Sequence, residues 1–154
     1  MWVNCLSKKT IEMNTEMKRP FSLVFNLLSV FFIVWLLVLP TRAQTIDSLI
    51  NVLNNENLTD TARISVLNRL SVEYKRVDVK KSFYYAKLAD STSSSIGFSL
   101  GRAEALLNIG YYHLRTSQYD LAIERYNEAQ TLFKNINNKV GIANVLLGLG
   151  AVYN

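Results

Sequence analysis

Few side chains in this sequence could do chemistry, and their spacing favours surface or packing roles. His113 is the single histidine, so no second imidazole can share a metal ion with it. Glu124 and Glu128 lie one helical turn apart beside Arg125, which indicates a solvated charged face, not an acid–base pair. We expect His113 to pack in the core or at the edge of a groove.

The sequence supports neither a phosphate-binding loop nor a site that uses thiol chemistry. Gly148-Leu149-Gly150 lacks the preceding strand and the loop context of a nucleotide-binding motif, and it indicates a close contact between helices. Cys5 is the only cysteine, which excludes an intrachain disulfide and a cysteine-based metal site. We therefore expect no enzymatic activity and no cofactor.

The net charge of +5 is unevenly distributed. Five of the 17 Lys and Arg residues, but only two of the 12 Asp and Glu residues, lie within residues 1–43, which leaves 12 basic and 10 acidic residues beyond them. A nucleic-acid-binding surface would concentrate positive charge on the folded part. We expect no nucleic-acid partner for this part of the chain.

The elements that would position these side chains are helices. Apolar residues recur at intervals of three and four along most of the chain beyond residue 44, which is the helical period. We expect helices over residues 45–53, 60–77, 79–95, 101–115, 119–135 and 139–154.

Several residues indicate where these helices begin and end. Thr45 or Asp47 could cap the first helix, and Asp78 the third. Gly97 is suited to a helix stop, and the serine-rich run at 91–95 predicts an exposed last turn before it.

The sequence repeats itself at forty residues. Residues 101–110 (GRAEALLNIG) align with 141–150 (GIANVLLGLG), so that Gly, Ala, Leu, Leu and Gly coincide. In the other direction Leu67 aligns with Leu107, again without an insertion. A fixed period in this range is typical of helical repeat arrays, in which each unit buries its apolar face against its neighbours.

These units resemble the tetratricopeptide repeats, in a variety of about forty residues. Small and large side chains alternate where that family requires them, at Leu106, Ile109, Gly110, Ala122, Tyr126 and Ala129. The resemblance implies an all-α solenoid of helical hairpins behind a capping segment at 44–60. About two and a half repeats would follow, at 61–100, 101–140 and 141–154, the last incomplete. The first unit departs from the pattern, because Leu70 replaces the glycine and Ser82 an alanine.

In the resembled fold, the first helix of each repeat lines a groove that receives peptides or partner helices. Leu107 and Tyr111 stand where some members carry the Lys and Asn that clamp a terminal carboxylate, so that clamp is absent. The resemblance thus implies a protein or peptide partner with an apolar extended or helical segment, or further repeats of the same chain. Transferred onto this sequence, the groove residues are Leu67, Ser71, Tyr74, Lys75, Glu104, Leu107, Tyr111, Leu114, Arg115, Asn144 and Leu147.

Residues 1–43 are expected to direct export. An uncharged apolar run at 21–39 follows Lys18-Arg19 and precedes Ala43, the pattern of a secretory signal peptide that is cut after Ala43. The run is also long enough to span a bilayer, so an uncleaved membrane anchor is the alternative. In both cases the basic flank stays in the cytoplasm and the repeats lie on the periplasmic side.

Two functions are consistent with these features. The first is an exported, non-catalytic protein–protein interaction module. The second is implied by a resemblance to exported arrays of such repeats: the extracytoplasmic sensory region of a bacterial signalling protein, a histidine kinase, nucleotide cyclase or helix-turn-helix regulator whose output domain is absent from this sequence. Residues 139–154 supply only the first helix of the third unit, so we expect the chain to be part of a longer protein.

Overall fold

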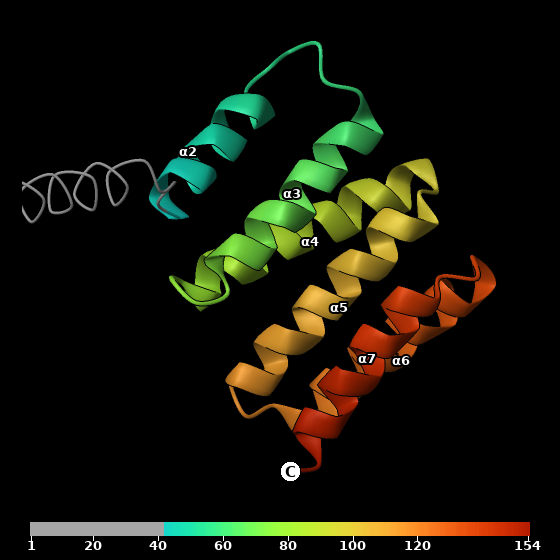
Figure 1. Cartoon of the computed structure of the whole chain (residues 1–154). Coiled ribbons are helices and arrows are strands. Elements are labelled where there is room, and N and C mark those ends of the chain that lie inside the picture. The colour runs from blue at the N-terminus through green and yellow to red at the C-terminus, as the bar shows by residue number, and fades with distance from the viewer. Residues whose placement is uncertain (1–41) are drawn as a thin grey trace, which may run out of the picture. The chain divides into compact units, whose positions relative to one another are not determined.

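Six helices and no strands make up residues 42–154, the part of the chain that the computed structural model describes, with side chains from Thr45 onward (Figure 1). The all-α prediction is confirmed for these residues. The apolar run at 21–39 and Cys5 lie outside the described residues. None of the described helices is long and apolar enough to cross a membrane. The helices are α2 (Arg42–Leu53), α3 (Asp60–Tyr74), α4 (Val79–Ile96), α5 (Ser99–Arg115), α6 (Tyr119–Asn135) and α7 (Lys139–Val152).

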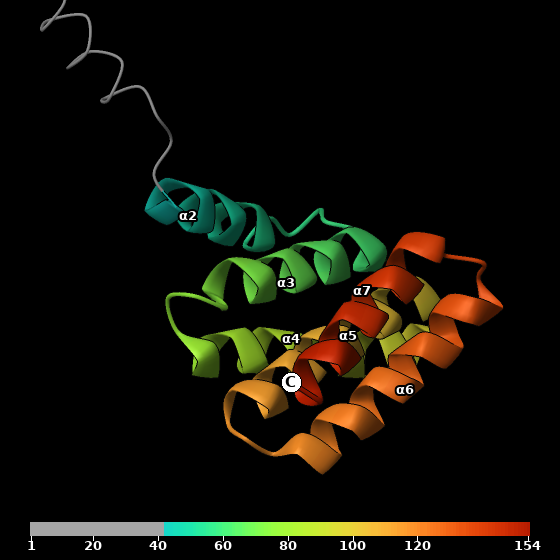
Figure 2. The ribbon, with the colours of Figure 1, turned by 60° about the horizontal axis from the view of Figure 1, so that its bottom comes forward.

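The helices form two layers. Helices α3, α5 and α7, here called the front helices, lie side by side in that order, and α4 and α6, the back helices, lie behind them (Figures 1 and 2). Short turns join consecutive front and back helices, so α5 packs against both back helices, whereas α3 packs against α4 and α7 against α6. Helix α2 covers the free side of α3. One surface of the array is therefore built from front helices alone.

Polar side chains and left-handed residues set the helix ends. The Asp78 carboxylate accepts hydrogen bonds from two backbone N–H groups and caps α4, and the Asn138 side chain accepts one from the Gly141 N–H and caps α7. Gly97 ends α4 with φ 70°, and forty residues later Asn137, which follows the end cap of α6 at Ile136, has φ 55°. The predicted roles of Asp78 and Gly97 are confirmed, and Ser117 also has a positive φ, 58°.

Three local predictions were wrong. Helix α2 begins at Arg42, so Thr45 and Asp47 lie inside it and cannot cap its amino end. Helix α3 ends at Tyr74, three residues before the expected end. The last turn of α4 is not wholly exposed, because the Ser93 side chain is completely buried between helices.

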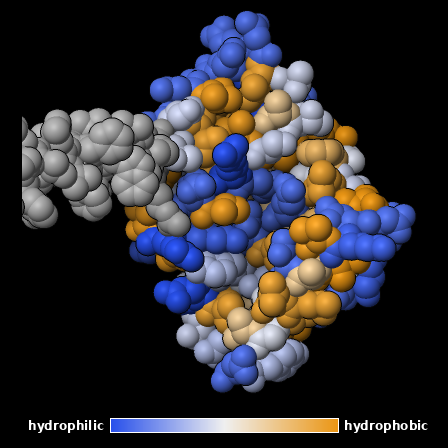
Figure 3. Space-filling model, in the orientation of Figure 1, coloured by the Kyte–Doolittle hydropathy of each residue, from blue (hydrophilic) through white to orange (hydrophobic). Residues whose placement is uncertain are grey.

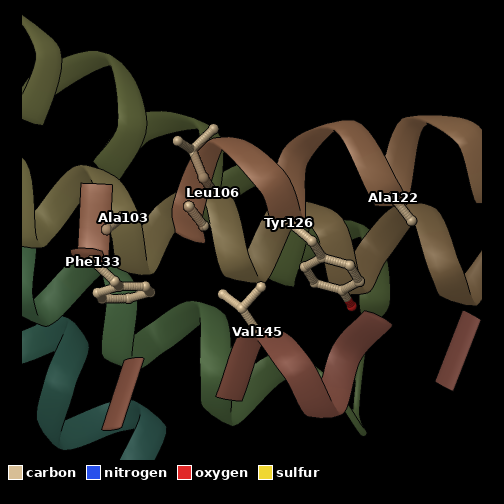
Figure 4. Packing of buried hydrophobic residues seen from close by; sticks show 7 residues of the cluster. Ala103, Leu106, Ala122, Tyr126, Phe133 and Val145 are labelled. Atoms are coloured by element: carbon tan, nitrogen blue, oxygen red, sulfur yellow. The ribbon is translucent and has the colours of Figure 1, made fainter. Parts of the chain in front are cut away.

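The largest group of buried apolar side chains joins α5, α6 and α7. Figure 4 shows residues of this group, among them Leu106 of α5, Tyr126 and Phe133 of α6 and Val145 of α7. The Tyr126 ring fits only because its neighbours are glycines. A Cβ on Gly110 would lie 2.6 Å from that ring, and one on Gly148 would lie 2.7 Å from it. Tyr126 therefore fixes α6 against both α5 and α7.

Candidate functional site

The front helices line a groove of about 870 Å³. Helix α3 provides its polar side, α5 its middle and α7 its far side, and Tyr126 reaches it from behind. In Figure 3, hydrophilic side chains predominate over the middle of α3, whereas hydrophobic ones gather over α7. The lining residues are Ser65, Asn68, Arg69, Val72, Glu73 and Lys75 of α3, Glu104, Leu107, Asn108, Tyr111 and Leu114 of α5, Tyr126 of α6, and Asn144, Leu147, Gly148 and Ala151 of α7.

Equivalent positions of the three front helices line this groove. Leu107 of α5 matches Leu147 of α7 at an offset of forty residues, as the sequence predicts. Leu107 also matches Asn68 of α3, at an offset of 39 residues, and Leu114 of α5 matches Lys75 of α3 at the same offset. Every groove residue of α5 has a counterpart in α3 at 39 residues, so the first unit is displaced by one position.

Seven of the predicted groove residues line this groove: Lys75, Glu104, Leu107, Tyr111, Leu114, Asn144 and Leu147. Arg115 lies outside it, in an adjoining hollow of about 470 Å³ at the ends of α5 and α7. Leu67, Ser71 and Tyr74 do not line the groove, because all three are buried in the core. Tyr74 packs against α2, in a cluster with Ile46 and Leu49.

The first unit has one residue fewer than the second between matching positions of its two helices, which explains these three misplaced residues. Six residue steps lead from Val72 of α3 to Asp78, which caps α4, whereas seven lead from the matching Tyr111 to Gln118 at the start of α6. The back helices keep the forty-residue offset, so the missing residue shifts only α3. A shift of one residue turns a helical position by about 100°. Ser71, not Leu70, thus takes the place of Gly110, and its hydroxyl lies 3.3 Å from that of Ser82.

The groove holds a lysine without an anionic partner. The Lys75 ammonium lies 4.8 Å from the centre of the Tyr111 ring, a cation–π arrangement between α3 and α5. The ion pairs among the described residues join Lys87 and Arg102 to Asp90 and Arg125 to two glutamates, and none includes Lys75. Burial lowers the pKa of Lys75 from its usual 10.5 to about 8.

A buried amide links α3 to α5 at the floor of the groove. The Asn68 Nδ2 group donates to the Gly101 carbonyl oxygen at 2.8 Å and to Glu104 Oε2 at 3.3 Å. Burial raises the pKa of the Glu104 carboxyl, and the hydrogen bond from Asn68 lowers it in part. Asn68 Oδ1 is buried and has no hydrogen-bond partner among the described residues. A buried acceptor without a partner is a cost to stability, and this atom lies out of reach of a segment bound in the groove.

Replacing Lys75 with methionine should stabilise the protein at pH 7, by about 1 kcal/mol after allowance for residual exposure. The folded-state pKa lies below the unfolded one, so the cost of burying the ammonium is fully present below pH 8. It disappears as pH rises from about 8 to 10.5. Urea unfolding at pH 7 and pH 10 measures the difference, which should shrink at pH 10. Exposed Lys80 provides the control, and an equal gain from Lys80→Met would contradict the explanation.

The other residues singled out from the sequence lie away from the groove. His113 stands on the side of α5 that faces α4, where its ring contacts Phe83 and its Nδ1 lies 2.6 Å from Gln118 Oε1. Glu124 and Glu128 both pair with Arg125, at 2.8 and 2.7 Å. No cluster of His, Cys, Asp and Glu side chains suited to a metal ion occurs in the described part of the chain.

Comparison with known proteins gives no further assignment: no protein-family model and no curated protein matches this chain.

Proposed function

We propose that residues 42–154 form a tetratricopeptide-like interaction module that binds a segment of a protein partner in the groove and performs no catalysis itself. The observation that carries this proposal is the alignment of equivalent positions of α3, α5 and α7 along one groove. A repeated front surface offers a series of similar contacts to an extended or helical segment.

The chemistry of the groove indicates the kind of segment that it accepts. Leu107, Leu114 and Leu147 provide apolar contacts, while Lys75 lacks an anionic partner among the described residues. A segment with leucine-like side chains and a nearby carboxylate would satisfy both features.

The place where the module acts is a further part of the proposal. The run at 21–39 behind Lys18-Arg19 supports export, with the module on the periplasmic side and either released or anchored.

The double substitution Tyr111→Ala with Leu114→Ala should weaken binding at least about tenfold, because it removes two large side chains from the middle of the groove. Peptides of about 12 residues are first selected on the wild-type protein from a random displayed library. Their affinities for wild-type and variant proteins are then compared by fluorescence anisotropy.

The matched control is Tyr84→Ala with Leu88→Ala, which removes the same two side-chain types from the exposed back of α4. Selected peptides should bind this variant as they bind the wild type. Equal binding to the groove variant, or equal loss in both variants, would place the binding surface elsewhere and reject the groove.

A further inference from the structure

The groove contains a second charged side chain that has no opposite charge beside it. The Glu104 carboxylate of α5 lines the groove and is half-buried, and no ion pair among the described residues includes it. Burial raises the pKa of this carboxyl, and the hydrogen bond from Asn68 acts against the rise. Glu104 is thus an acidic counterpart of Lys75 in the same groove.

Contacts between α3 and α5 hold both charges in place. Asn68 of α3 donates to Glu104 Oε2 at 3.3 Å, and the same amide donates to the Gly101 carbonyl oxygen at 2.8 Å. The Lys75 ammonium lies 4.8 Å from the centre of the Tyr111 ring. Both charged groups are therefore positioned before a ligand arrives, which lowers the cost of ordering them on binding.

The two charges lie at different levels of the groove. Asn68, which holds Glu104, and Lys75 are seven residues apart on α3, and seven residues of a helix rise by about 10 Å. The charges are therefore too far apart to pair with each other. On α5, Leu107 lies between the levels of Glu104 and Tyr111 and also lines the groove. The groove thus has a negative level, an apolar middle and a positive level.

We propose that the groove binds a protein segment that carries a basic and an acidic side chain about 10 Å apart, the basic one on Glu104 and the acidic one on Lys75. An apolar side chain between them contacts Leu107. This inference rests on the proposed function, to which it adds the second charge and the order of the two charges. The spacing corresponds to about seven residues of a helical segment or about three of an extended one.

A segment with one kind of charge satisfies only half of this arrangement. An acidic segment pairs with Lys75 but covers Glu104 without pairing it, and removing an unpaired carboxylate from water is unfavourable. A basic segment has the same disadvantage at Lys75. A segment with both charges in the stated order pairs both groups.

Two other charged residues of α3, Arg69 and Glu73, line the groove as well. Neither forms an ion pair in the described part of the chain, and Arg69 is exposed, so its charge is more strongly screened than that of a half-buried group. Along α3 the positive charge of this pair comes first and the negative one second, the reverse of the order of Glu104 and Lys75. The order of charges in a bound segment therefore distinguishes the two pairs.

The test uses peptides that are selected on the wild-type protein and that lose affinity for the double variant Tyr111→Ala with Leu114→Ala. Glu104→Gln and Lys75→Met each remove one charge and nearly preserve the shape of the side chain. At pH 7, which is below the Lys75 pKa of about 8, exchanging the basic residue of the peptide for methionine should weaken binding to the wild type at least about fivefold. The same exchange should weaken binding to Glu104→Gln less than about twofold.

The acidic residue of the peptide should show the same dependence on Lys75→Met and none on Glu104→Gln. The matched control is Arg69→Met with Glu73→Gln, which removes one charge of each sign from the same groove. Both peptide residues should keep their full effect on binding to this control variant. Circular dichroism should show the wild-type helix content for every variant.

The possible failures are distinguishable. Peptides that require Tyr111 and Leu114 but show no dependence of their charges on Glu104 and Lys75 would overturn this inference and leave the proposed function standing. Dependence on Arg69 and Glu73 instead would overturn it in the same way, because the order of charges would be reversed. If no selected peptide requires Tyr111 and Leu114, the proposed function is rejected and this inference with it.

Discussion

Replacing Tyr126 with alanine should lower the free energy of unfolding by about 3–5 kcal/mol, the range for truncating a large buried aromatic side chain. Tyr126 is 1% exposed and contacts two glycines on two different helices. Its removal leaves a cavity that glycines cannot fill, and α6 loses its contact with α5 and α7 at once. Burial also raises the pKa of the Tyr126 phenol to about 12, which agrees with a ring held in an apolar setting.

Such a loss is a large fraction of the stability of a domain of this size, which is of the order of 5–15 kcal/mol. We expect the variant to be largely unfolded at 37 °C, as measured by urea denaturation followed by circular dichroism. Tyr119→Ala is the control, because Tyr119 belongs to the same helix and is 50% exposed. A loss below about 1 kcal/mol for Tyr126→Ala, or a similar loss for Tyr119→Ala, would contradict the assigned role.

The helices were predictable because residues close to their ends determine where they begin and end. Asp78 and Asn138 cap helices through their own side chains, and Gly97 adopts a left-handed conformation that few other residues adopt. These signals act within three or four residues, so no knowledge of the tertiary structure is needed to read them.

The rotation of α3 was not predictable from its own apolar residues. The helical period is followed by Leu67, Leu70, Ser71 and Tyr74. That spacing is the same whether these residues or their neighbours face the groove, so it does not determine the rotation of α3. What decides the rotation is that α3 is linked to α4 by one residue fewer than matching positions of α5 and α6, together with α2, which covers Tyr74. The pairing of Ser71 with Ser82 was a signal, because two small residues replace the glycine and alanine of the second unit.

The electrostatics of the groove depend on residues that are far apart in the sequence. Lys75 acquires its lowered pKa and its aromatic neighbour only when Tyr111 of the next front helix lies beside it. Asn68 likewise becomes buried by its contact with Gly101. The lowered pKa of Lys75 and the burial of Asn68 both result from packing between units. The sequence pattern of a single helix therefore does not predict them.

Two glycines at the same place in successive units should respond to alanine in opposite directions. Gly110→Ala should destabilise the protein by about 1–3 kcal/mol, because the new Cβ would lie 2.6 Å from the buried Tyr126 ring, which cannot move without disturbing three helices. Gly150→Ala should instead stabilise it by about 0.5–1 kcal/mol, because the methyl group meets nothing within 4 Å and alanine favours the helix.

Urea unfolding of both variants beside the wild type measures the two changes in the free energy of unfolding. Equal losses would mean that Gly150 is already covered in the isolated protein, and equal gains would mean that Tyr126 does not rest on Gly110. Opposite signs would establish that one sequence position serves as a closed contact in α5 and as an open one in α7.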